Sequence, residues 1–210
     1  MPTRHLVQPS QHLSQIAALY GYRDYHTVWN HPLNDSLRAT RSNPNVLEPG
    51  DIVFVPDHVI KEVQGATTIE HHFRIDTSPL RLDVTLVAHD LRPVASTECE
   101  FSVDGASSLD STDEAGVLRL PITTSSRTGN LHIGDRSFAL RIGDLDPVTS
   151  RRGAAARLGN LGYYLGSDID SLDDERFRLA VEEFQCDNSL PVDGTMNDVT
   201  AAVLVKAHRS

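Results

Sequence analysis

Apolar positions in the last third of the chain recur every three or four residues, which predicts amphipathic helices. The segments "GAAARLGNLGYY", "RFRLAVEEFQ" and "VTAAVLVKAH" each carry such a stripe, and the first reaches a terminating glycine at Gly162. Ser171 and Thr195, each followed three residues later by an aspartate, are the expected N-caps of the second and third helices. We therefore predict a three-helix bundle over residues 148–210. Its expected core residues are Leu158, Leu161, Phe177, Val181, Phe184, Leu190 and Val203.

Between residues 66 and 147 the apolar positions alternate with polar ones, as in half-buried β-strands. The segments "LRLDVTLVA", "ECEFSV", "VLRLPI" and "NLHI" follow this pattern. "IGDRSFALRI" indicates a hairpin that turns at Gly134–Asp135. Short strands at this spacing predict a sandwich of about seven strands. "STDEAGVLRLPI" resembles a turn of immunoglobulin-like modules, so we expect an immunoglobulin-like β-sandwich.

Residues 1–65 have the order strand, helix, helix, strand. "HLVQP" and "DIVFVP" are short strand segments, and "LSQIAALYG" has helical spacing up to Gly21. "DYHTVW" and "LNDSLRATR" predict further short helical turns, the last with Leu33 and Leu37 on one face. The whole chain is thus predicted to be a multidomain α+β protein with domains at 1–65, 66–147 and 148–210.

Charge and composition narrow the choice of partners. The 210 residues include 19 Lys and Arg against 29 Asp and Glu, a formal net charge of −10. Because phosphate recognition needs clustered basic residues, nucleic acid and anionic membranes are not expected partners. The start "MPTRHLVQPS" lacks the apolar stretch of a secretory signal, so we expect a cytoplasmic protein without a signal peptide. Cys99 and Cys186 lie in different predicted domains and are expected to be free thiols.

Two motifs near the N-terminus, "HLVQPSQHLSQIAALYG" and "NPNVLEPGDIVFVP", resemble LysM domains over residues 4–57. The resemblance implies a shallow groove for N-acetylglucosamine polymers between the two motifs. The alternative is a LysM-like unit that is purely structural or docks a protein. The residues that would contact a ligand or partner in the groove are Pro9, Ser10, Gln11, His12, Asn43, Asn45 and Val46. Trp29 is either a core residue or an exposed aromatic anchor for that ligand or partner.

The C-terminal motifs "LGNLGYY", "AVEEFQ" and "LPVDG" resemble the peptidoglycan-binding domain type 1 family over residues 150–208. The chain departs from that family in "SDIDSLDDE", which has no glycine after Gly166. Asp168 and Asp170 in this loop are candidate ligand-binding residues. The acidic run does not fit an EF-hand, since Leu172 and Leu179 stand where that loop needs oxygen ligands. We expect no metal and no cofactor.

Catalytic signatures such as HExxH, GxSxG or a Cys–His pair are missing from the sequence, so we expect a non-catalytic protein. The order of modules, with "VWNHPLNDSLRATRSNPNVLEPGDIVFVPD" and "LRIGDLDPVTSRRGAAARLGNLGYYLG", resembles bacterial proteins encoded beside spike and PAAR-tip genes of type VI secretion clusters. That resemblance implies an adaptor or cargo-loading factor, which binds a spike or effector protein. Such a factor stays in the cytoplasm or leaves through the contractile machine. The alternative is a cell-wall-binding protein that anchors an associated protein to peptidoglycan glycan.

Overall fold

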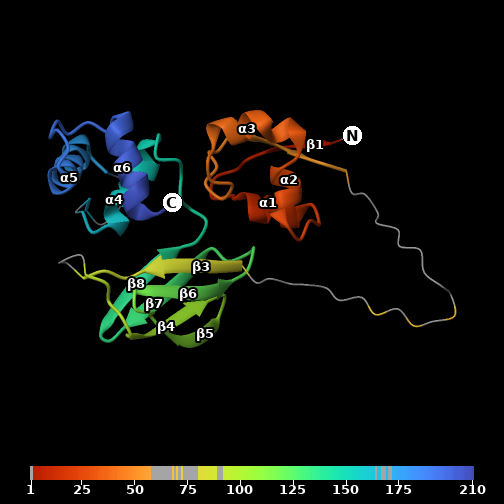
Figure 1. Cartoon of the computed structure of the whole chain (residues 1–210), viewed down its shortest axis with the longest axis horizontal. Coiled ribbons are helices and arrows are strands. Elements are labelled where there is room, and N and C mark those ends of the chain that lie inside the picture. The colour runs from red at the N-terminus through yellow and green to blue at the C-terminus, as the bar shows by residue number, and fades with distance from the viewer. Residues whose placement is uncertain are drawn as a thin grey trace.

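The computed structural model describes residues 2–57, 68, 70, 72, 80–88, 92–163, 165–166, 169 and 172–210. Within these ranges the protein has six α-helices, one 3-10 helix and antiparallel sheets, so it mixes α and β structure. The elements form three groups: an N-terminal unit, a central β unit and a helical unit (Figure 1). No helix in the described ranges has the length and apolar character needed to cross a bilayer.

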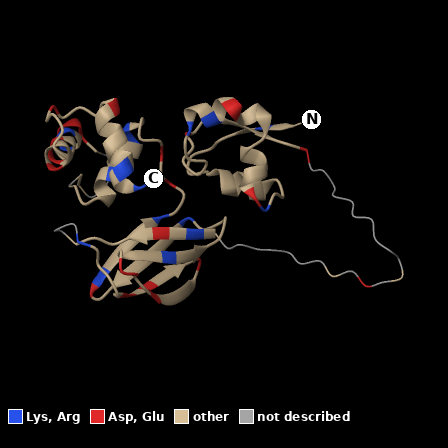
Figure 2. Ribbon diagram, viewed as in Figure 1, with Lys and Arg blue, Asp and Glu red and all other residues tan. Residues whose placement is uncertain are grey.

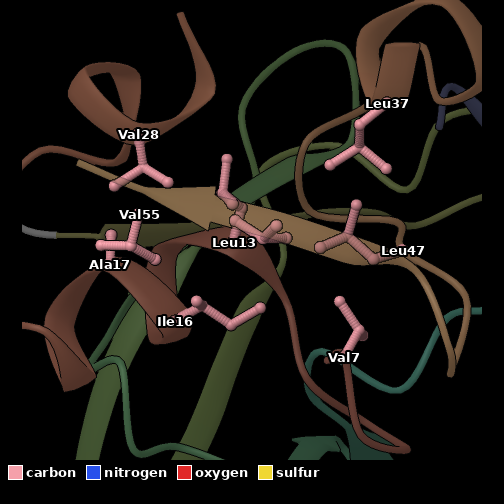
Figure 3. Close-up of a cluster of buried hydrophobic side chains, with 9 residues drawn as sticks. Val7, Leu13, Ile16, Ala17, Val28, Leu37, Leu47 and Val55 are labelled. Carbon is pink, nitrogen blue, oxygen red and sulfur yellow. The ribbon is translucent and has the colours of Figure 1, made fainter. Parts of the chain in front are cut away.

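The N-terminal unit follows the predicted order of strand, helices and strand. Its elements are β1 (Thr3–Leu6), α1 (Leu13–Leu19), α2 (Tyr25–Trp29), η1 (Pro32–Asn34), α3 (Asp35–Thr40) and β2 (Ile52–Val55). The two strands pair antiparallel, which brings the ends of the unit together. Apolar side chains from the helices and β2 converge on one core (Figure 3). That core consists of Val7, Leu13, Ile16, Ala17, Val28, Leu37, Leu47, Val53 and Val55.

The expected pairing of Leu33 and Leu37 on one helical face is wrong. Leu37 is buried at 7% exposure, whereas Leu33 is 47% exposed. The reason is that Pro32 begins a 3-10 turn, and the α-helix begins only at Asp35. The buried place in this turn is taken by Asn34, whose side chain bonds to backbone groups of α2 and β2.

The central β unit consists of two antiparallel sheets that share one hydrophobic core. β3 (Leu80–Thr85) pairs with β6 (Val117–Ile122). The other sheet has the order β5-β4-β7-β8, formed by β5 (Ala106–Ser111), β4 (Glu98–Val103), β7 (Thr128–Ile133) and β8 (Arg136–Arg141). The predicted hairpin at Gly134–Asp135 is confirmed, because Ile133 pairs with Arg136. The shared core contains Cys99, Phe101, Leu118, Leu120, Leu131 and Ile142.

Strand β5 is absent from the prediction, although a signal for it precedes it. Asp104 and Gly105 have φ of 51° and 79°, and they form a two-residue turn between β4 and β5. An Asp-Gly pair is a strong hairpin signal. The strand itself, "ASSLDS", has no apolar alternation because every residue in it is exposed. With β5 included, the described part of this unit has six strands rather than the roughly seven expected.

The helical unit contains α4 (Arg151–Asn160), α5 (Asp174–Asp187) and α6 (Asp198–His208) around one hydrophobic cluster. The predicted burial of Val181 and Phe184 is confirmed. Val203 is only partly buried, and Leu204 takes the core position instead. The buried cluster is Ala154, Ala155, Leu158, Leu165, Ala180, Val181, Phe184 and Leu204.

The predicted N-caps of α5 and α6 are both two residues too early. Asp173 caps α5 and Asn197 caps α6, each accepting a hydrogen bond from the backbone N–H three residues later. The predicted cap Ser171 lies outside the described residues, and Thr195 lies before the turn that leads into α6. Aspartate and asparagine cap helices as well as serine and threonine do. The capping-box spacing therefore could not choose between neighbouring candidates.

Candidate functional site

The two N-terminal motifs meet at the start of α1. The backbone N–H of Leu13 donates to the carbonyl of Pro44 over 3.2 Å. The hydroxyl of Ser14 donates to Oδ1 of Asn45 over 2.9 Å, and the His12 side chain also bonds to Asn45. The structure thus brings together the segments that were expected to border a groove.

This face of the N-terminal unit is covered by a segment of the same chain. The Ser10 hydroxyl donates a hydrogen bond to the carboxylate of Asp144, which follows β8. His12 is 7% exposed. Its ring lies against Gly143, where an added Cβ would come within 2.6 Å of Cδ2 of His12. Residues 143–144 therefore occupy the face at the positions expected to contact a ligand. We call the surface formed by Ser10, His12 and Asn45 the α1 face.

The remaining predicted groove residues have different surroundings. Pro9 is exposed. Oε1 of Gln11 lies 2.9 Å from both Nε2 of His5 and the backbone nitrogen of Gln8. These contacts stabilise the turn that contains Gln11. Oδ1 of Asn43 accepts a hydrogen bond from the next turn of the chain. These residues hold the loop in shape, and they do not converge on a single open pocket with the α1 face.

Asn43 and Val46 instead line a cavity of about 110 Å³ between the N-terminal and helical units. Val148 and Arg157 contribute to its lining from the other side. Arg157 is 2% exposed, and Nη1 donates to the Asp146 carbonyl over 2.7 Å. Burial lowers the pKa of Arg157 to about 10. Because residues of both units line it, this cavity lies at the interface between the N-terminal and helical units.

Ionic contacts join the covering segment to the helical unit. Nη2 of Arg152, in α4, lies 2.6 Å from Oδ2 of Asp144, and its Nη1 lies 3.0 Å from Oδ2 of Asp146. Arg141, in β8, lies 3.6 Å from the same Asp144 carboxylate. Burial acts to raise the pKa of Asp144, but the hydrogen bonds from Ser10 and Arg152 bring it below the usual value. Asp144 is thus held ionised where the three units meet.

His12 is favoured in its neutral form. Burial lowers its pKa, and the positive charge of Arg127 lowers it further. Only the hydrogen bond with Asn45 opposes this shift. Arg127 comes from the connection between β6 and β7, so the central unit supplies both the covering segment and a cation beside the imidazole.

Trp29 ends α2 and packs against the N-terminal core as a partly buried side chain. Its backbone carbonyl accepts a hydrogen bond from Arg38 in α3. These contacts match the role of a residue that covers the core. Whether the exposed part of the ring also anchors a partner stays a prediction.

The helical unit has a second cavity, of about 280 Å³, between the start of α4 and residues Ile169 and Leu172. Its apolar lining is supplied by Ala155, Ile169 and Leu172, and its polar lining by Arg151 and Arg152. The candidate residues Asp168 and Asp170 lie outside the described residues, but Ile169 between them borders this cavity.

Arg151 is held at the edge of this cavity by contacts from α5. Its guanidinium pairs with the Asp174 carboxylate and lies 5.0 Å from the centre of the Phe177 ring. The side chain of Asp174 is 95% exposed, so this ion pair is open to solvent. An incoming anionic group can therefore exchange with Asp174 at low cost.

Gln185 explains why "AVEEFQ" and "LPVDG" occur together. Its fully buried amide donates to Oδ1 of Asp193 over 2.8 Å and to Oγ1 of Thr200 over 3.1 Å. Its Oε1 accepts from the backbone nitrogens of Asp193 and Gly194 over 3.0 and 2.9 Å. One side chain thus fixes the turn between α5 and α6. Sequence reasoning missed this role, although a glutamine directly after a core phenylalanine was a signal for it.

Charged residues of both signs are mixed along the described parts of the chain (Figure 2), and they do not gather into a metal site there. Basic and acidic positions are interspersed in all three units (Figure 2). No group of three or more His, Cys, Asp or Glu side chains gathers among the described residues in a way that could hold a metal ion.

The comparisons with known proteins bear on the helical unit. Residues 150–204 match the family described as "Putative peptidoglycan binding domain". No curated protein and no solved structure matches the chain. The family match covers α4, α5 and most of α6, and with them the 280 Å³ cavity and the Gln185 turn. This part of the chain is therefore similar to a peptidoglycan-binding domain.

Proposed function

We propose that this protein is a non-catalytic cell-wall-binding protein that binds peptidoglycan through its helical unit. The observation that carries the proposal is the family match over residues 150–204. The match supports peptidoglycan as the ligand, and the cavity beside Arg151 supports the site that we propose for it. The LysM likeness of residues 4–57 stays a prediction and is not needed for this proposal.

The lining of the cavity suits the chemistry of peptidoglycan. Its apolar floor can accept the apolar face of a sugar ring or a methyl group of a stem peptide. Guanidinium groups bind carboxylates with two parallel hydrogen bonds, and stem peptides carry carboxylates. Arg151 can supply this contact by exchanging its exposed partner Asp174.

Sedimentation with purified sacculi tests the proposal. We expect the intact chain to sediment with sacculi and to be released by free muropeptides. Arg151→Ala should weaken this binding several-fold. Arg178→Ala is the matched control, because Arg178 also pairs with an acidic side chain and has similar exposure, 50% against 44%, but does not line the cavity.

The two possible failures of this experiment mean different things. A wild-type chain that stays in the supernatant at every sacculus concentration would refute peptidoglycan binding. Equal binding by Arg151→Ala and Arg178→Ala would leave peptidoglycan binding intact and refute the cavity as its site. A muropeptide titration followed by calorimetry gives the same distinction in solution.

A second candidate function, an adaptor in a contractile injection machine, is favoured by one observation. The α1 face, which was expected to border a glycan groove, is covered by Gly143 and Asp144. In this candidate the N-terminal unit is a structural part, and the chain binds a spike or effector protein in the cytoplasm or leaves with it. Direct binding to a purified spike protein with a PAAR tip, together with no sedimentation on sacculi, would favour this function over the first.

A further inference from the structure

Residues 143–146 lie in the connection between β8 and α4, and the Asp144 side chain reaches all three units. Asp144 accepts from Ser10 of the N-terminal unit, pairs with Arg152 of the helical unit, and lies near Arg141 of β8. A single carboxylate thus links three separately packed cores. Removing the N-terminal or the helical unit would take one of its three partners from this carboxylate.

Gly143 meets two requirements of this junction that a residue with a side chain meets poorly. Its φ is +72°, a region that side-chain-bearing residues rarely adopt. The same residue lies so close to His12 that a Cβ would be 2.6 Å from Cδ2 of the ring. Because Gly143 and His12 are packed this closely, a shift of either residue would break the contact.

The groups around His12 disfavour a positive charge on its ring. The first turn of α1, all of which is described, carries no acidic side chain. The 43–47 segment presents the neutral Asn45, and the β6–β7 connection presents Arg127. Asp144 follows Gly143, but its carboxylate is already engaged by Ser10 and by two arginines.

We propose that residues 143–146 act as an acid-released latch. The latch holds the N-terminal unit against the other two units while His12 is neutral, and it frees that unit and uncovers the α1 face when His12 gains a proton. The device depends on Gly143 for its fit and on His12 beside Arg127 for its response to acid.

The direction of the pH effect follows from linkage. Burial lowers the pKa of His12 in the closed state, whereas exposure in the open state returns it toward 6.5. Above pH 6.5 both states carry a neutral ring, and the closed state keeps its full advantage. Below pH 6.5 the open state binds a proton more readily. The closed-to-open ratio then falls by up to about tenfold for each pH unit, until the lowered pKa is reached.

Small-angle scattering of the intact chain at pH 8 and pH 5 tests the response to acid. We expect the radius of gyration to rise reversibly at pH 5. His12→Asn, which places a neutral hydrogen-bonding amide beside Asn45 and cannot be protonated, should show no rise. His208→Asn is the control for the other histidine with a lowered pKa, which is partly buried, and it should behave like wild type. A rise that persists in His12→Asn, or none in wild type, would overturn the proposal.

Two glycine variants test the latch at constant pH. Gly143→Ala should open the junction at pH 8, because its Cβ collides with His12. Gly105→Ala imposes a similar backbone strain, at φ +79°, but its Cβ meets nothing within 4 Å. The measurement is the rate at which diethyl pyrocarbonate modifies His12, read by peptide mass spectrometry.

We expect a rate increase of tenfold or more in Gly143→Ala and a wild-type rate in Gly105→Ala. Equal rates in the two variants would refute the latch. Neither experiment contains peptidoglycan, so these results are independent of the proposed binding function.

Discussion

Phe184 is the largest side chain in the buried cluster of the helical unit. It is 1% exposed, and its ring meets the Tyr163 ring edge-to-face at a centroid distance of 5.5 Å. Replacing a buried phenylalanine by alanine costs about 3–5 kcal/mol. An edge-to-face aromatic pair accounts for roughly 0.5–1.5 kcal/mol of such a loss. Since stability is roughly 0.05–0.15 kcal/mol per residue, a unit of about 60 residues is stable by about 3–9 kcal/mol, and we expect Phe184→Ala to remove most of that stability.

Hydrogen exchange on α4, α5 and α6 is the assay that isolates this effect, because a chain with several cores does not unfold as one two-state system. Phe177→Ala is the matched control on the same helix. Phe177 is only partly buried and packs against the edge of the core, so its loss should be clearly smaller. If Phe184→Ala leaves the protection of α5 amides at the wild-type level, Phe184 does not lie on the face of α5 that packs into the core.

Two further predictions concern the N-terminal unit. Asn34→Ala should lower its stability by about 1–3 kcal/mol, measured by thermal unfolding, because buried backbone groups of Phe54 lose their side-chain partner; an unchanged melting temperature would show that water replaces the amide. Trp29→Ala should lower the melting temperature while leaving ligand or partner capture unchanged if the ring only covers the core. Lost capture with a wild-type melting temperature would identify Trp29 as an anchor instead.

The parts of the fold that could be predicted are those fixed by local periodicity. The helical stripe through Val181 and Phe184 and the hairpin at Gly134–Asp135 both follow from residues close together in the chain. The prediction was wrong where periodicity stops. β5 has no apolar face, so its sequence does not alternate between apolar and polar residues. Leu33 lies in a 3-10 turn that begins at Pro32, before the start of α3.

The candidate site was predictable only in part, because some of its contacts join residues that are far apart in the sequence. The meeting of residues near Leu13 with those near Asn45 could be expected, since a short α+β unit must close on itself. The hydrogen bond from Ser10 to Asp144 joins residues 134 positions apart. Ser10 and Asp144 are both ordinary surface residue types, so composition gives no sign that they meet. Gly143 likewise looks like any turn glycine until His12 is packed against it.

The covering of the α1 face has a consequence for both candidate functions. While Asp144 holds Ser10, the 280 Å³ cavity of the helical unit is the ligand-binding candidate whose described lining does not include residues 143–146. Peptidoglycan binding at neutral pH should therefore depend on Arg151 and be indifferent to Ser10. Opening the junction adds a second surface and leaves the Arg151 contacts of the first in place, because Arg151 is held by α5; Arg152, which also lines the cavity, would lose its contact with Asp144 only if that carboxylate moved. The two surfaces can thus be tested separately, each by its own variant.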